Sequence, residues 1–208
     1  MPPIHPLFDL VAWDLAPRWF DGDESVVDDL PADVALLAKD RYDGPGLQGA
    51  GFEGRDLAAT GCVAAEVVVD DEVSLMTVDF TVDPEGHSSP GGWGAGSGPG
   101  PRLSDPATRP SLGGSPFAPI CAPHGNSTMG RLRSDVLRLR DDVVSVRVGT
   151  RELAVPAHGT VTVVGVRGVD ELLTVTSVCG ISWSGTLEDL DRLFYPRIAW
   201  DVQDEPDR

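Results

Sequence analysis

The sequence predicts a mainly β, α+β protein: an antiparallel β-sandwich or partial barrel with two short helices and a long Gly/Pro/Ser-rich loop. Two stretches with alternating apolar and polar residues, 62–82 and 143–183, predict the strands, because alternate residues of a strand face one side of a sheet. Turn signals spaced roughly 8–12 residues apart in the second stretch are typical of sandwiches and barrels. The length of 208 residues and the hydrophobic content of 41% predict a single domain, 1–208, with a buried core.

The N-terminal arm, residues 1–24, is rich in aromatic residues and proline, and we expect it to be irregular. So many large apolar side chains in a terminal segment predict that it packs on the domain, with a docking peptide as the alternative. The first helix is expected to begin near Leu30, because Val27, Leu30, Val34 and Leu37 lie at helical spacing. Gly44-Pro45-Gly46 then ends it.

Residues 62–82 predict a β-hairpin. Met76, Val78, Phe80 and Val82 alternate with polar residues, and Asp70-Asp71 supplies the turn. The composition then changes: residues 86–119 contain 9 Gly, 7 Pro and 6 Ser, which predicts a flexible loop or linker. Within it, Trp93 is a candidate partner-binding residue or, alternatively, a tether to the core.

The C-terminal part predicts short strands that begin with Val144, Val146 and Val148 and end near Trp183. A second helix follows. Thr186 is a suitable N-cap, Asp189 occupies the capping-box position, and Pro196 ends the helix. Residues 201–208 form a polar, acidic tail.

The charge is uneven along the chain, whose formal net charge is −17. Residues 1–100 carry 19 acidic and 4 basic side chains, residues 101–167 carry 5 and 9, and residues 168–208 carry 9 and 3. Such acidity argues against binding nucleic acid, which needs clustered positive charge. The basic cluster could either grip an anionic partner or neutralise the acidic first half, and we favour neutralisation. It comprises Arg131, Arg133, Arg138, Arg140, Arg147 and Arg151.

Candidate chemistry centres on Cys121 and His124, which are three residues apart beside the expected loop. With His87 they could hold a zinc ion, since catalytic zinc needs three protein ligands. The simpler interpretation, which we prefer, is a cysteine and a histidine without a shared role. Nothing else in the sequence predicts a catalytic set, so we expect no cofactor, with zinc as the alternative.

Composition also predicts the setting of the protein. The basic residues are one lysine and 15 arginines, which is typical of the coding bias of a high-GC bacterium. Three widely spaced cysteines and the lack of a secretory signal predict the cytoplasm. The sequence contains no run of about 18 apolar residues, so it predicts no membrane-spanning helix.

These observations together predict a non-catalytic protein-binding or regulatory module that acts through its acidic N-terminal half. The expected partner is another protein, of basic character, and the charge asymmetry also allows self-association. Two alternatives stay open. One is a metal-dependent enzyme or small-ligand binder with a site around Cys121, His124 and His87 under the 86–119 loop. The other is a structural subunit of a larger assembly.

Overall fold

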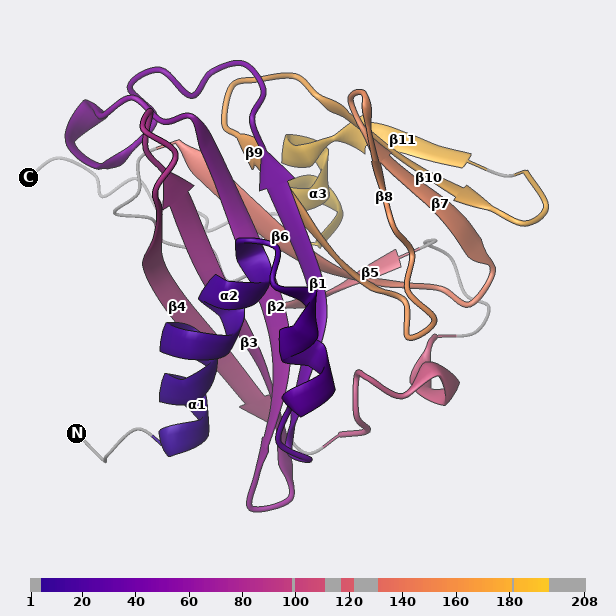
Figure 1. Cartoon of the computed structure of the whole chain (residues 1–208). Coiled ribbons are helices and arrows are strands. Elements are labelled where there is room, and N and C mark those ends of the chain that lie inside the picture. The colour runs from indigo at the N-terminus through magenta and orange to yellow at the C-terminus, as the bar shows by residue number, and fades with distance from the viewer. Residues whose placement is uncertain (1–4, 99, 111–116, 122–130, 181, 195–208) are drawn as a thin grey trace, which may run out of the picture.

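The protein is built from three antiparallel sheets and a few short helices, which confirms the predicted mainly β class (Figure 1). The computed structural model describes residues 5–98, 100–110, 117–121, 131–180 and 182–194. The acidic tail, residues 201–208, lies outside the described residues. Within the described ranges, no helix is long and apolar enough to cross a membrane.

Sheet A is a meander of four strands in chain order: β1 (Val34–Tyr42), β2 (Ala59–Val69), β3 (Glu72–Val82) and β4 (Ser88–Gly98). The predicted hairpin is confirmed as β2 and β3, which pair from Ala59↔Val82 to Val69↔Glu72. Both turn residues, Asp70 and Asp71, have positive φ, as a type I′ hairpin turn requires.

Strand β1 corrects the helix expected from Leu30. Its buried residues lie at 34, 37, 38, 40 and 42. A bulge between Leu36 and Ala38 adds one residue to β1 against β2, and this breaks the simple alternation. The resulting spacing of apolar residues resembles a helical period, which explains why the sequence pattern was misleading.

Strand β4 corrects part of the expected 86–119 loop. It pairs with β3 from Val82↔Ser88 to Val73↔Gly98, with one register shift. The backbone groups of Gly and Ser complete a ladder as well as any other residue can, and Trp93 anchors the strand by stacking on Phe8 with ring centroids 6.1 Å apart. Further along, the segment contains η4 (Pro106–Thr108) and β5 (Phe117–Cys121).

The N-terminal arm is helical, so the expected irregular structure is wrong, but its packing on the domain is confirmed. A helical path runs through α1 (Pro6–Leu10), a π-helical turn η1 (Val11–Leu15) and α2 (Ala16–Phe20). Pro17 has no N–H to donate to the preceding turn, which fits the wider turn just before it. A 3-10 helix, η2 (Glu24–Asp29), follows. The buried face of these helices covers one side of sheet A (Figure 1).

Sheets B and C come from the second half of the chain. Sheet B has the order β5, β6 (Leu132–Leu139), β9 (Thr160–Val166). Sheet C has the order β11 (Ser182–Thr186), β10 (Leu172–Ser177), β7 (Val143–Val148), β8 (Arg151–Leu153). The predicted C-terminal strands and the second helix, α3 (Leu187–Phe194), are confirmed. The Asp189 N–H donates to Thr186 Oγ1 (3.2 Å), and the Thr186 N–H donates to the Asp189 carboxylate (2.8 Å).

Strands β6 and β9 are the middle layer of the molecule. Toward sheet A they present Leu132, Val136 and Val164, which pack with residues of β1 and β2. Their opposite side, with Leu137 and Val163, packs against sheet C and α3. The β2–β3 hairpin and the C-terminal strands therefore belong to separate apolar clusters, which pack on opposite sides of β6 and β9.

Candidate functional site

The residues predicted to hold zinc are not brought together as a described cluster. Cys121 is the last residue of β5, and His124 lies outside the described residues. His87 is exposed in the β3–β4 turn, where its Nδ1 lies 3.3 Å from the Asp83 carboxylate. In the part of the chain that the structure describes, no three His, Cys, Asp or Glu side chains are grouped to hold a metal.

The predicted arginine cluster is distributed over several local contacts. Arg133 pairs with Asp135 (2.6 Å) and Arg140 pairs with Asp142 (2.5 Å). Arg131, by contrast, donates to the backbone carbonyl of Gly46 (3.0 Å). Neither Asp135 nor Asp142 belongs to the acidic first half, and Gly46 contributes only a backbone carbonyl, so these three contacts do not supply the expected neutralisation of that half.

Arg151 is the member of the cluster that reaches an acid of the first half. Its guanidinium donates to both oxygens of Asp40 at 2.7 Å and to the carbonyl of Val164 at 2.7 Å. The Asp40 carboxylate in turn accepts from the Val164 N–H at 2.8 Å. Burial raises the pKa of Asp40, and the positive charge of Arg151 opposes that shift. This junction joins β1, β8 and β9, one strand from each sheet, and occupies the open edge of β9.

A second buried polar cluster holds the strap, which we define as residues 102–109. Glu66 of β2 is fully buried, and its carboxylate accepts from Arg102 Nε (2.6 Å), from Ser104 Oγ (2.9 Å) and from the N–H groups of Leu103 and Ser104. Burial alone would raise the pKa of Glu66, but the hydrogen bonds from Arg102 and Ser104 outweigh it, so the pKa is lowered.

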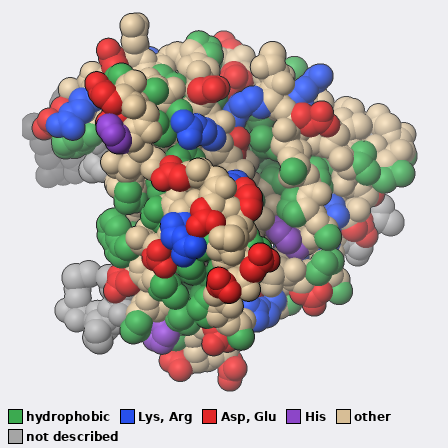
Figure 2. Space-filling model, viewed as in Figure 1, with side chains coloured by type: hydrophobic (Ala, Val, Ile, Leu, Met, Phe, Trp, Pro, Cys, Tyr) green, Lys and Arg blue, Asp and Glu red, His purple; other side chains and the backbone are tan. Residues whose placement is uncertain are grey.

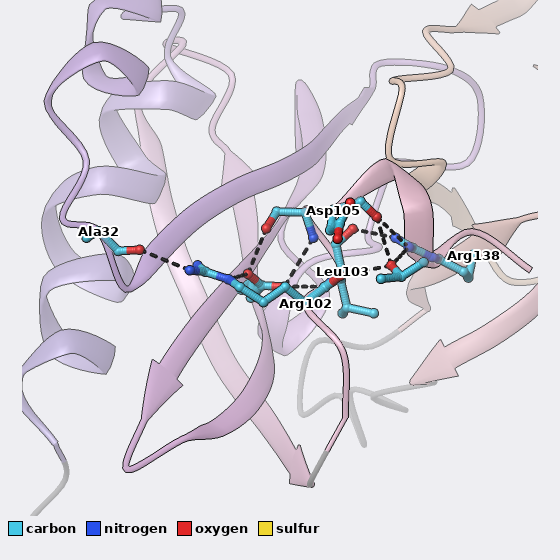
Figure 3. Close-up of polar contacts among 8 residues, drawn as sticks. Ala32, Arg102, Leu103, Asp105 and Arg138 are labelled. Carbon is cyan, nitrogen blue, oxygen red and sulfur yellow. Dashed lines mark hydrogen bonds and ion pairs between the residues drawn. The ribbon is translucent and has the colours of Figure 1, made fainter.

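Arg138 of β6 holds the opposite side of the strap (Figure 3). Its guanidinium donates to the carbonyl of Leu103 (2.5 Å) and to the hydroxyls of Thr108 (2.5 Å) and Thr160 (2.9 Å). The strap is therefore bonded to sheet A through Glu66 and to sheet B through Arg138. Since Glu66 and Arg138 each make several hydrogen bonds to the strap inside the protein, we assign the cluster a structural role.

The best candidate for a binding site is a groove of about 560 Å³ beside β1. It is lined by residues 37–41 of β1, by residues 152–154 with Pro156, and by Val161 and Thr162 of β9. Trp19 and Phe20 close the end next to α2. The volume lies within the range of roughly 300–1,000 Å³ that is usual for ligand pockets.

The aromatic end of the groove is held by a charged contact. Glu24 accepts from Trp19 Nε1 (2.9 Å) and from Lys39 Nζ (2.6 Å), and Lys39 also donates to the carbonyl of Trp19 (2.7 Å). The hydrogen bond from Lys39 lowers the pKa of Glu24. Arg41 lies over the Phe20 ring, with 5.6 Å between its guanidinium carbon and the ring centroid. These contacts fix the position of the groove wall before any ligand binds.

An acidic face adjoins this end of the groove. We use this name for the exposed acidic residues among positions 9–33, which lie on and beside the N-terminal helices and number seven: Asp9, Asp14, Asp21, Glu24, Asp28, Asp29 and Asp33. Figure 2 shows acidic side chains gathered over α2 and η2. Arg18 and Lys39 supply positive charge here, through Asp23 (2.8 Å) and Glu24.

Sequence reasoning missed the groove, although it singled out parts of its surroundings. In the sequence, Trp19 is one of several aromatic residues of the arm, and Lys39 is the single lysine, without a motif around it. Thr162 and Leu153 were absorbed into predicted strands, and no local signal distinguishes them. Trp93, the proposed binding residue, is half-buried against Phe8.

No family model, curated protein or solved structure matches the chain. The groove and the acidic face are therefore the features from which a function can be inferred.

Proposed function

We propose that this chain is a non-catalytic protein-binding module that uses its acidic face to bind a basic partner protein in the cytoplasm of a high-GC bacterium. The observation that carries the proposal is the charge of residues 9–33, which hold eight acidic residues and one arginine. A surface of one sign attracts a partner of the opposite sign and speeds their encounter. Arg131, Arg133, Arg138 and Arg140 contact groups outside this segment, so they do not offset its charge.

The helices make the acidic face a firm contact surface. Val11, Ala12 and Ala16 are fully buried against sheet A, so the exposed carboxylates project from a packed layer. A preorganised surface loses less conformational entropy on binding than a disordered acidic segment would lose. This supports recognition of a folded or extended protein partner.

The proposal is tested by affinity capture from a lysate of the source organism at about 50 mM salt, where surface charges are weakly screened. The test variant is Asp28→Asn/Asp29→Asn/Asp33→Asn. The control is Asp141→Asn/Asp170→Asn/Glu188→Gln, which changes the net charge equally at exposed positions in the second half of the chain.

We expect the wild-type chain and the control to retain the same protein, identified by mass spectrometry, and the acidic-face variant to lose it. Retention should also fall as salt is raised, because the attraction is electrostatic. Capture of nothing above background at 50 mM salt, or equal capture by both variants, would contradict the proposal.

A further inference from the structure

We propose that the groove receives an extended segment of the partner protein, which adds as a strand along the outer edge of β1; this inference rests on the proposed function. The segment carries apolar side chains at alternate positions and a basic side chain at the end nearest α2. Strand addition of this kind combines backbone hydrogen bonds with side-chain pockets.

The first observation is that both strands bordering the groove, β1 and β8, have an unpaired edge. In the described part of the sheets, β1 is paired only with β2, and β8 only with β7. Both edge strands border the groove. An unpaired strand edge presents a row of N–H and C=O groups that another strand can pair with.

A side chain already occupies one end of this edge. The carbonyl of Arg41 accepts from the Arg151 guanidinium (3.1 Å). Alternate residues of a strand direct their backbone groups to the same edge. Lys39, two residues before Arg41 and part of the groove lining, therefore presents its N–H and C=O to the groove beside this contact.

The third argument is an unpartnered hydroxyl. Thr162 is 2% exposed and borders the groove, and its Oγ1 has no hydrogen-bond partner among the described residues. A buried hydroxyl without a partner is costly, so such groups are uncommon in proteins. A polar side chain or backbone group of the incoming segment would satisfy it.

The chemistry of the occupant follows from the lining and its neighbours. Leu37, Leu153 and Pro156 make the walls largely apolar, which suits alternate apolar side chains. Lys39 is bound by Glu24 and Asp40 by Arg151, while Arg41 lies over the Phe20 ring. The acidic face beyond Trp19 and Phe20 outweighs these cations, because residues 9–33 hold eight acidic residues and one arginine, and this favours a basic side chain at that end.

The probe for the test is a phage-displayed library of random linear 12-residue peptides, selected on the wild-type protein at 50 mM salt. The selected peptides are then synthesised and their affinities measured by fluorescence polarisation. Three variants are compared: Ala154→Arg, which places a large charged side chain in the groove; Ala157→Arg, the same change at an exposed alanine outside it; and Thr162→Val, which replaces the hydroxyl with a methyl group. Circular dichroism checks that each variant folds.

We expect Ala154→Arg to weaken binding at least tenfold, Ala157→Arg to change it less than twofold, and Thr162→Val to weaken it about threefold. Bound peptide should also slow hydrogen exchange of the Lys39 amide at least tenfold, a readout that loss of packing would not produce. Selected peptides should alternate apolar residues and carry Arg or Lys near one end.

Unchanged binding to Ala154→Arg, or an unaltered Lys39 amide, overturns strand addition. A Lys39 amide that is protected from exchange without peptide also overturns the inference, because a segment of this chain then occupies the edge of β1. If that protection rises with protein concentration, the occupant is a second copy of the chain. If the library yields no binder while lysate capture still depends on the acidic face, the proposed function stands and the strand inference fails.

Discussion

Replacing Glu66 by alanine is expected to detach the strap from sheet A. The carboxylate is fully buried and accepts from the Arg102 side chain, from the Ser104 hydroxyl and from two consecutive backbone N–H groups. Without it, these donors lose their acceptor inside the protein, and water must replace it. The strap should then open locally at a much lower free energy than the rest of the fold.

The expected loss of stability follows from how deeply Glu66 and Arg102 are buried. Removing one member of a buried ion pair costs ~3–5 kcal/mol. The Arg102 side chain is 40% exposed, so solvent stabilises it after the carboxylate is lost and the low end applies. We therefore expect Glu66→Ala to lower the free energy of unfolding by about 3 kcal/mol. Glu66→Gln keeps one acceptor oxygen and should cost about 1–2 kcal/mol.

Urea unfolding followed by tryptophan fluorescence measures these differences, and hydrogen exchange at the Leu103 and Ser104 amides locates them. Glu72→Ala, at an exposed carboxylate that begins β3, is the control and should stay within about 0.5 kcal/mol of wild type. The reasoning is refuted if Glu66→Ala falls in the same narrow interval, or if the two strap amides exchange as slowly as before.

Three further predictions concern stability. The native pKa of Glu66 is lowered from 4.5, so the ionised carboxylate contributes its full stabilisation above pH 4.5. This stabilisation declines as the pH falls through the native pKa. The difference in urea midpoint between wild type and Glu66→Gln should therefore narrow from pH 6 to pH 3. Thr186→Ala removes the N-cap acceptor of the Asp189 N–H and should cost about 1 kcal/mol in urea unfolding, with an unchanged result contradicting the capping box. Gly61→Ala places a methyl against the Phe20 ring and should lower the thermal midpoint by the equivalent of about 2 kcal/mol; a higher midpoint would contradict the tight packing.

The elements that sequence could predict are those specified by neighbouring residues. The hairpin of β2 and β3 follows from alternation on both sides of Asp70-Asp71, and α3 begins where Thr186 and Asp189 can cap each other. Strand β1 was misassigned because its bulge depends on pairing with β2, which is a tertiary property. Strand β4 was missed because its glycines form backbone hydrogen bonds to β3 but have no side chains, so they show no alternation of apolar and polar residues.

The candidate site was less predictable for the same physical reason. The groove is assembled from residues 19–20, 37–41 and 152–162, which approach each other only in the folded chain. The acidic face could be predicted from composition, since its residues are close in sequence. Whether the arginine cluster neutralised it could not be predicted, because that depends on where Arg133, Arg138 and Arg140 point after folding.

The junction between Asp40 and Arg151 also orders events during synthesis. Sheet A is a sequential meander, so a nascent chain can complete its four strands and their helical cover from the first hundred residues. Asp40 must wait for a partner 111 residues further along the chain. Until β6 and β9 have been translated, the other side of sheet A, with Cys62 and Ala64, is an uncovered apolar surface, which makes the partly synthesised chain prone to aggregation.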